Sequence, residues 1–493
     1  MDIRFLPHNT HFEGAEEFFR NDPHLKALGK QPLVYRSPLL KELPHHQEGI
    51  YTIGGGRQVG KTTLLKQWMA DLLRGGVAPQ RIVYFTGELI DDHHSLVRLL
   101  METLEGMSSN DLRYLLLDEV TYIRQWDKGI KYLADAGILQ NTVMVLTGSD
   151  LVIIQEARMR FPGRRGPADT VDFHLYPLNF FQTAQLKTVL APEISARLLD
   201  LRVTPPADAV RKLYAAFDDY LIHGGFLTAI NDMAKHQRIP PYTFSTYSDW
   251  IRGDVLKRGK QEHYLREVLD AVVKRYGSQV TWNALAHDLS IDHPKTIADY
   301  AALLESMDAV VIQSAILENK LTAAPKKARK LIFSDPFIFH AVRAWLRSSK
   351  DPYKQQVVPL MSDPAWVSKL VEACVIGHYR RYFPTYYIKA EGEVDIAYVD
   401  RNRFWPVEIK WSRQLRPKDL KQIAKYPNSR ILSNALQSGA IQGVPVEPLP
   451  LALFRFGLKE MRSGVGQREV ISEQCNKGLG RRAQGIGKEK NSK

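Results

Sequence analysis

Cysteine is scarce in this sequence. The 493 residues include two cysteines, Cys374 and Cys475, which is too few for a disulfide framework or a thiolate zinc site. Runs of about eighteen or more apolar residues, the length that a membrane-spanning helix needs, do not occur. The first residues, 1–5, also lack the charged-then-apolar pattern of a secretory signal. We therefore expect a cytoplasmic protein that has no membrane partner.

The spacing of the histidines does not indicate a metal site, whereas the net charge indicates a polyanionic partner. The adjacent pairs His45-His46 and His93-His94 do not have metal-ligand spacing and are typical of surface loops. Apolar residues make up 44% and charged residues 25% of the chain, as in ordinary globular proteins, and the length suits two to four domains. The net charge of +13 favours a polyanionic partner, and we expect this partner to be nucleic acid, DNA in the first instance.

A phosphate-binding motif is the strongest signal in the chain. Residues 55–62 fit the pattern G-x-x-x-x-G-K-[ST], with an apolar segment before them and a run of helix formers after them. Strand, glycine-rich turn and helix is the context that this motif requires, because backbone N–H groups and the helix N-terminus then face the phosphates. Lys61 would reach the β- and γ-phosphates, and the Thr62 hydroxyl would hold Mg²⁺. The predicted ATP site comprises Gly55, Gly56, Arg57, Gln58, Val59, Gly60, Lys61, Thr62 and Thr63.

Two carboxylates follow a second apolar run. Residues 115–117 are leucines, and Asp118 and Glu119 come directly after them. Continuous apolar residues are typical of a parallel strand that is buried on both faces. Asp118 is then placed to help hold Mg²⁺, and Glu119 to polarise the water that attacks the γ-phosphate. The alternative, an exposed pair at the end of a strand, becomes weak beside the motif at 55–62.

The next apolar run, 142–146, predicts a third strand of the same sheet. Thr147 and Ser149 follow it, and either hydroxyl can sense the γ-phosphate. A strand-to-helix turn with an ordinary cap is the alternative.

A cluster of arginines comes next along the chain. It suits a solvated face, an arginine finger or a contact to a phosphate backbone, and we take Arg164 as the candidate finger. The cluster consists of Arg158, Arg160, Arg164 and Arg165.

The middle of the chain has a different pattern of helical and apolar segments. Two short helical patterns and then two apolar segments occur at 282–289, 294–307, 309–316 and 329–333. This order predicts a winged helix, whose second helix would read a DNA groove. That helix carries Lys295 together with Asp299 and Glu305, and this combination of charges does not favour binding to DNA. A packing module between domains is the alternative.

A second set of charged residues lies on a predicted hairpin. Residues 393–399 and 404–410 alternate as strands do, so Glu408 and Lys410 share a face and Asp395 comes close to them. Two carboxylates can bind Mg²⁺, with Glu372 of the preceding helix as a further ligand, and Lys410 can orient or help deprotonate a metal-bound water. The alternative is an exposed hairpin of mixed charge, and Val394 rather than proline precedes Asp395.

The order of these motifs resembles a large prokaryotic family of P-loop ATPases that are related to the AAA+ and archaeal ATPases. Its members carry a winged-helix segment and a C-terminal domain of unknown function that is similar to restriction endonucleases. The resemblance covers roughly residues 30–455 and implies the roles given above for Lys61, Thr62, Asp118 and Glu119. It also implies a nuclease-like fold around Asp395, Glu408 and Lys410. The matching segments are 55–62, 115–119, 146–149, 162–164, 176–180, 220–226, 334–336, 393–395 and 407–410.

We therefore predict an α/β protein with a P-loop NTPase core on a parallel sheet, a helical and winged-helix middle region, and a C-terminal restriction-endonuclease-like α/β domain. The expected divisions are an N-terminal lead (1–45), the ATPase core (46–180), a helical region (181–261), the winged-helix-like segment (262–335), the nuclease-like domain (336–456) and a basic disordered tail (457–493).

Three functions fit this organisation, and each uses ATP and Mg²⁺. The first is an ATPase coupled to a nuclease-like domain that acts on or with DNA. The second is an ATP-dependent switch whose C-terminal domain binds a partner without cutting. The third is a remodelling ring, a homo-oligomer in which Arg164 or a neighbouring residue acts in trans.

Overall fold

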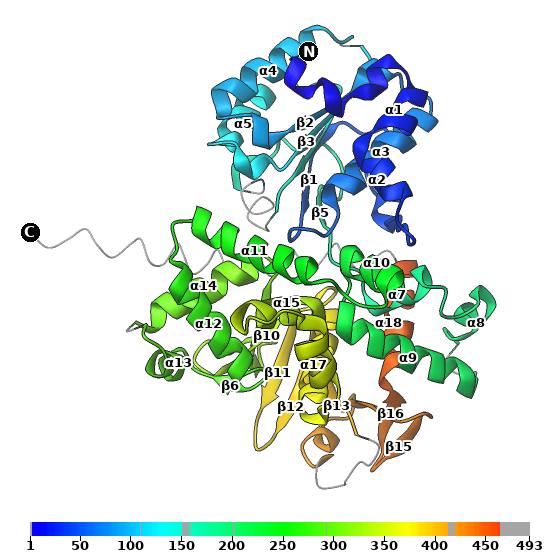
Figure 1. Cartoon of the computed structure of the whole chain (residues 1–493), viewed down its shortest axis with the longest axis vertical. Helices are drawn as coiled ribbons and strands as arrows, with labels where there is room; N and C mark the ends of the chain where they lie inside the picture. The colour runs from blue at the N-terminus through cyan, green and yellow to red at the C-terminus, as the bar shows by residue number, and fades with distance from the viewer. Residues whose placement is uncertain are drawn as a thin grey trace, which may run out of the picture. The chain divides into compact units, whose positions relative to one another are not determined.

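The computed structural model describes residues 2–108, 110–149, 157, 159–200, 203–291, 293–412 and 420–463. The chain divides into two compact units, Met1–Tyr176 and Pro177–Lys493 (Figure 1). None of the helices in the described ranges is long and apolar enough to cross a membrane.

The first unit is built on a five-stranded parallel sheet. Its strand order is β2-β3-β4-β1-β5, and every neighbouring pair runs in parallel. The strands are buried along nearly their whole length, as the continuous apolar runs of the sequence predicted. Figure 1 shows the sheet between α1, α2 and α3 on one side and α4 and α5 on the other. The bounds are β1 (Gly49–Gly54), β2 (Ile82–Thr86), β3 (Arg113–Asp118), β4 (Thr142–Thr147), β5 (Asp172–His174), α1 (Ala15–Asn21), α2 (Pro23–Gly29), α3 (Lys61–Arg74), α4 (His93–Glu105) and α5 (Trp126–Asp135).

The N-terminal lead belongs to this unit. The Asn9 side chain donates to the backbone oxygen of Tyr84 and accepts from its N–H, each at 2.8 Å, and so pairs with the edge strand β2. His11 lies 2.7 Å from the backbone oxygen of Ile82 on the same strand. Because an unpaired sheet edge is a site for unwanted pairing, these contacts explain why residues before the expected core at 46 are ordered.

The second unit begins with a group of helices. They are α7 (Phe180–Leu186), α8 (Pro192–Arg197), α9 (Ala207–His223), α10 (Leu227–His236), α11 (Pro241–Lys257), α12 (Glu262–Lys274), α13 (Trp282–Asp288), α14 (Pro294–Ser306), α15 (Pro336–Leu346), α16 (Val358–Met361), α17 (Pro364–Arg380) and α18 (Leu449–Ser463). Gly224 and Gly225 lie between α9 and α10. Helix α18 continues beyond 457, where the basic tail was expected to begin, and residues 464–493 of that tail lie outside the described residues.

Asp335 connects the α9–α10 turn to the start of α15. It is fully buried, and its two carboxylate oxygens accept from the backbone N–H groups of Phe337 at 2.8 Å and Gly225 at 2.9 Å. Gly224 has φ +57°, and a Cβ at this position would lie 1.7 Å from Asp335 Oδ1. Burial raises the pKa of Asp335 to about 6. Gly224 therefore lets the turn approach this carboxylate closely.

Two further sheets follow in the second unit. The small one has the order β6-β10-β7 and consists of β6 (Gln279–Val280), β7 (Val310–Ser314) and β10 (Arg329–Phe333), with the short hairpin of β8 (Ile316–Leu317) and β9 (Thr322–Ala323) nearby in the chain. The large one has the order β11-β12-β13-β14-β16-β15 and consists of β11 (Thr385–Lys389), β12 (Glu393–Asp400), β13 (Arg403–Lys410), β14 (Arg430–Ser433), β15 (Gly439–Ile441) and β16 (Val444–Pro448).

The predicted hairpin is confirmed in this larger sheet. Strands β12 and β13 are antiparallel, and Asp400 pairs with Arg403 across a two-residue loop. The loop residues Arg401 and Asn402 have φ of 47° and 61°, as a type I′ turn requires. The expected succession of two helices and two strands at 282–333 is also present, and β6 joins it as a third strand that the sequence pattern did not suggest.

Candidate functional site

The phosphate-binding turn lies between β1 and α3. Gly55 has φ +149°, and a Cβ on it would lie 2.3 Å from the backbone oxygen of Leu175, so only glycine fits here. Gly60 has φ +96° with open space at its Cβ position, and it precedes the first residue of α3, Lys61. Gln58 also has a positive φ, 61°, and Val59 is buried. The backbone therefore forms a concave turn that ends at a helix N-terminus, as an anion site requires.

Lys61 is held inside this turn. Its ammonium donates to the backbone oxygens of Gly55 at 3.1 Å and Gly56 at 2.9 Å, and it lies 3.5 Å from Glu119 Oε1. The side chain is 4% exposed. A buried ammonium with two neutral acceptors and one carboxylate is placed to exchange these partners for phosphate oxygens, because charged acceptors make the stronger hydrogen bonds.

Asp118 accepts hydrogen bonds from three hydroxyl groups. Thr62 and Tyr84 donate to Oδ2, each at 2.6 Å, and Thr147 donates to Oδ1. The carboxylate is 3% exposed at the end of β3. The structure therefore brings Thr62 and Asp118, the two predicted Mg²⁺ ligands, into direct contact.

Glu119, the residue after Asp118, has an unusual backbone conformation. Its φ of 52° is in the left-handed region, which is uncommon for a residue other than glycine. Its N–H donates to Thr147 Oγ1 at 2.9 Å, and its buried Oε2 has no hydrogen-bond partner among the residues that the structure describes. Because β4 lies next to β3, Thr147 at its tip contacts both the Asp118 carboxylate and the backbone N–H of Glu119. An unsatisfied buried oxygen at this point is consistent with a missing polar partner such as water.

Tyr84 is the residue of this site that sequence reasoning missed. It lies on β2, the strand next to β3, and its ring is 4.1 Å from the ammonium of Lys66. Burial and the neighbouring Asp118 carboxylate raise the pKa of Tyr84 well above its usual value, so the phenol remains a proton donor. The signal in the sequence was a polar aromatic residue in an otherwise apolar strand, but nothing there gave its register with β3.

The arginines of the predicted cluster take different places. Arg165 is buried and donates to Asp172 Oδ1 at 2.6 Å and to the backbone oxygen of Ile50 at 3.1 Å, so it is part of the core. Arg164 pairs with Asp135 at the end of α5 and donates to the backbone oxygen of Pro162 at 3.1 Å.

These contacts put Arg164 beside the amino end of the sheet, whereas the phosphate-binding turn follows the carboxyl end of β1. It therefore does not join the site of its own chain, and a finger role in trans stays a prediction. Arg160 is 3.3 Å from Asp127, and Arg158 lies outside the described residues. Arg57 of the phosphate-binding turn donates to the hydroxyl of Tyr122.

The charged face of the C-terminal hairpin also forms. Asp395 Oδ2 accepts from the backbone N–H of Ile409 at 2.8 Å, and Glu408 Oε1 lies 2.5 Å from the ammonium of Lys410. Burial, followed by the charge of Asp395, raises the pKa of Glu408 to about 8. Asp395, Glu408 and Lys410 therefore share one face of the sheet, as their spacing predicted.

A lysine that the sequence did not single out lies on the same face. The Lys330 ammonium of β10 is 2.7 Å from Glu372 Oε1, it pairs with Glu393, and it is 3.8 Å from Asp395 Oδ1. Burial, followed by the charge of Asp395, raises the pKa of Glu372 to about 7. Glu372 and Asp395 thus face a lysine while Glu408 faces Lys410. In the described ranges, no three His, Cys, Asp or Glu side chains are grouped so that they could hold a metal ion.

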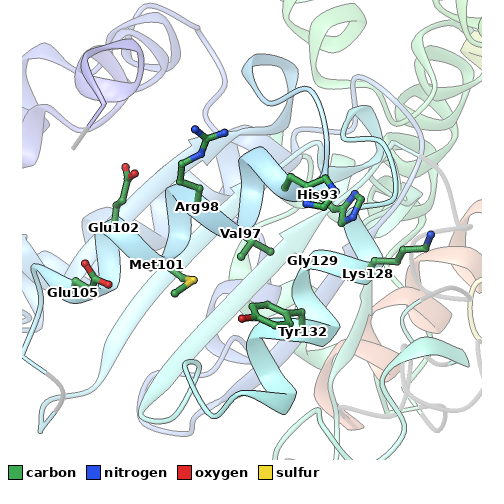
Figure 2. A pocket seen from close by; sticks show the side chains of 10 residues that line it. His93, Val97, Arg98, Met101, Glu102, Glu105, Lys128, Gly129 and Tyr132 are labelled. Atoms are coloured by element: carbon green, nitrogen blue, oxygen red, sulfur yellow. The ribbon is translucent and has the colours of Figure 1, made fainter.

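A cavity of about 660 Å³ lies in the first unit, away from the residues described above. Figure 2 shows Val97 and Met101 of α4 on one side and Tyr132 of α5 on the other, with Arg98 and Glu102 on the rim. The phosphate-binding turn, Asp118 and Glu119 do not line it. It is a groove between two helices and not a part of the candidate nucleotide site.

Comparison with known proteins gives distant relatives. An uncharacterized protein of Haemophilus influenzae is 26% identical over 288 residues, which are 56% of this chain and 65% of that protein. An uncharacterized protein of Methanocaldococcus jannaschii is 25% identical over 251 residues, 46% of this chain and 48% of that protein. The matches therefore span less than two thirds of these relatives. Among solved structures, a Walker-type ATPase of Pyrococcus abyssi aligns with 12% identity and a TM-score of 0.37, over 60% of this chain and 91% of that chain.

Two family models match parts of the chain. Residues 214–349 match a domain of unknown function, DUF8612, which includes the winged-helix-like segment and the part of the expected helical region from residue 214 onwards. Residues 47–183 match an AAA domain. This second match contains the phosphate-binding turn, Asp118, Glu119 and Thr147, on a parallel sheet of the order β2-β3-β4-β1-β5. Residues 47–183 are therefore similar to an AAA domain, and their parallel sheet and glycine-rich turn have the arrangement of a P-loop ATPase fold.

Proposed function

We propose that the first unit binds ATP with Mg²⁺ in its phosphate-binding turn and hydrolyses it. The observation that carries this proposal is the convergence of Lys61, Thr62, Asp118, Glu119 and Thr147 at the carboxyl ends of three strands. The backbone N–H groups of residues 55–63 would hold the phosphates, and Lys61 would leave the Gly55 and Gly56 oxygens for them. Mg²⁺, held by Thr62 and Asp118, would neutralise charge on the β- and γ-phosphates.

Glu119 is the proposed base for the attacking water. Its free Oε2 provides the acceptor that a water molecule needs, and its left-handed backbone turns the side chain towards Lys61. Thr147 fixes the position of Glu119 through the N–H contact and holds Asp118 through its own hydroxyl proton. Catalysis would then rest on positioning and on charge neutralisation, as phosphoryl transfer generally does.

Lys61→Ala tests the nucleotide site. We expect ATP affinity, measured by calorimetry with Mg²⁺ present, to fall by about 100-fold or more, because two charge-assisted hydrogen bonds to phosphate are lost. Lys128→Ala is the matched control, since Lys128 is exposed on α5 and donates to Gln125 alone among the contacts described for it. Equal ATP affinity for the two variants would disprove the assignment.

We also propose that the second unit acts with DNA. The support is the net charge of +13, the helix-helix-strand-strand order of 282–333, and the order α17, β11, β12 and β13 around one charged face, which suits a restriction-endonuclease-like domain. Glu305 of α14, however, pairs with Arg380 of α17 at 2.7 Å. This contact supports the alternative that α13 and α14 are a packing module, so we assign DNA contact to the unit and not to α14.

Salt dependence tests the DNA proposal. We expect affinity for duplex DNA, measured by fluorescence anisotropy, to fall about tenfold or more between roughly 50 and 200 mM salt, because bound lysines and arginines release counterions from the phosphate backbone. A polyglutamate of similar length is the control for an unspecific polyanion effect. An affinity that hardly changes over this range would remove DNA as the partner.

The C-terminal sheet bears on the choice between a nuclease and a switch. The shared face of Asp395, Glu408 and Lys410 favours a nuclease-like origin, whereas the pairing of the acidic side chains with lysines favours an ATP-dependent switch that binds without cutting. We prefer the switch, and ATP turnover without DNA cleavage is what it requires.

A further inference from the structure

Acidic side chains on one face of the C-terminal sheet contact a buried lysine, Lys330. Glu372 of α17 and Glu393 and Asp395 of β12 come from two elements, and all three meet the ammonium of Lys330. Lys330 is 2% exposed, while the three carboxylates are 22%, 35% and 14% exposed. The lysine is therefore the innermost member of the group.

The charge balance keeps Lys330 protonated. Burial alone would lower the pKa of Lys330, but Glu372, Asp395 and Glu393 together raise it above its usual value. The ring of Tyr387 lies 5.6 Å from the ammonium and adds a favourable face. A buried cation with several carboxylates and an aromatic face has the electrostatic surroundings that a bound metal ion would have.

Lys330 reaches this place because the small sheet packs against the edge of the large one. Ala315 forms a bridge with Tyr387 of the edge strand β11, and the Tyr387 hydroxyl donates to the backbone oxygen of Ala328 at 2.7 Å. The Gln313 side chain donates to the backbone oxygen of Asp395 at 2.9 Å, and Gln279 donates to Glu393. Each strand of the small sheet thus supplies a polar contact to the face that carries the carboxylates.

The residues present do not fit a divalent cation. Hard cations need several oxygen ligands around one point. Here Lys330 occupies the point between Glu372, Glu393 and Asp395, and Glu408 is turned to Lys410. This disagreement with the expected Mg²⁺ ligands Glu372, Asp395 and Glu408 is informative in itself.

We propose that Lys330 is an internal replacement for the metal ion, and that its contact with Glu372, Glu393 and Asp395 locks the sheet β6-β10-β7 onto the C-terminal sheet and excludes divalent cations. In this arrangement the C-terminal sheet does not act as a metal-dependent nuclease. The inference does not depend on ATP hydrolysis by the first unit.

The test is thermal unfolding of the full chain and its Lys330→Met variant, with and without Mn²⁺. We expect the variant to melt roughly 5–10 °C lower, because three carboxylates lose their buried counter-ion. Mn²⁺ at about ten times its Kd should raise the melting temperature of the variant by about 3 °C and leave that of the unchanged chain where it is. Lys327→Met is the control, since Lys327 is on the same segment and its described contact is a hydrogen bond to the backbone oxygen of Lys389.

A second variant covers the case in which Lys330→Met does not fold. The double variant Lys330→Met with Glu372→Gln removes one of the uncompensated charges, and we expect it to recover part of the lost melting temperature. The proposal fails if Lys330→Met melts like Lys327→Met. It also fails if the unchanged chain is stabilised by Mn²⁺ and cleaves plasmid DNA in a manner that Lys410→Ala abolishes.

Discussion

Glu119→Gln is expected to reduce ATP turnover by about 10²- to 10⁴-fold, the usual contribution of a positioned general base. Glutamine keeps the size and the hydrogen-bonding capacity of the side chain, so the turn at 55–63 should still bind ATP with an affinity within a few fold of the unchanged chain. The reason is geometric, because Glu119 contacts Lys61 and Thr147 through one oxygen and its backbone and leaves Oε2 free. Steady-state turnover and calorimetry with Mg²⁺ measure the two quantities.

Glu88→Gln is the matched control for this experiment. Glu88 is exposed just after β2, the neighbouring strand, so the same change of charge is made near the same sheet edge without touching the site. Its turnover should equal that of the unchanged chain. If Glu119→Gln keeps more than about a tenth of the original turnover, another group activates the water.

Local patterns were sufficient to predict which residues the structure brings together at the candidate nucleotide site. The turn at 55–62, its flanking strand and helix, and the apolar run before Asp118 are each contiguous in the sequence, and their chemistry depends on neighbours within a few residues. Thr147 could be predicted because the tips of parallel strands gather at one sheet edge. The preference for Thr147 over Ser149 needed the register of β4 with β3, which pairs Leu146 with Leu117 and so brings Thr147 to Asp118.

Contacts between segments that are distant in the sequence could not be predicted from local patterns. Tyr84 and Lys330 lie in short strands that are mostly apolar, and neither belongs to a recognisable motif. Their partners are 34 residues away for Tyr84 with Asp118, and 42 residues away for Lys330 with Glu372. The hairpin at 393–410 was predictable because its turn and alternation are local, but the cation on its acidic face comes from another sheet. The predicted metal ligands were thus located on the correct face while their partner was missed.

Lys66→Met is expected to destabilise the first unit by about 3–5 kcal/mol, the usual cost of breaking a buried ion pair from one side. Lys66 and Asp22 are both 0% exposed, with 3.0 Å between ammonium and carboxylate, and the ammonium also donates to the backbone oxygen of His8 at 2.7 Å. Methionine fills a similar volume but leaves Asp22 charged and without its cation. The ring of Tyr84 loses its cation as well, and Tyr84 holds Asp118. Chemical denaturation measures the loss.

A control variant and the ATP affinity distinguish the loss of the Lys66–Asp22 ion pair from the general effect of removing one positive charge. Lys131→Met changes an exposed lysine on α5 and should alter stability by less than about 0.5 kcal/mol. Because the N-terminal lead contacts the site through Lys66 and Tyr84, ATP affinity should also fall in Lys66→Met, whereas it should not in Lys131→Met. A Lys66→Met protein as stable as Lys131→Met would mean that the lead is not fixed to the ATPase unit by this ion pair. Any coupling between the lead and Asp118, the proposed Mg²⁺ ligand, would then not depend on the contact of Lys66 with Tyr84.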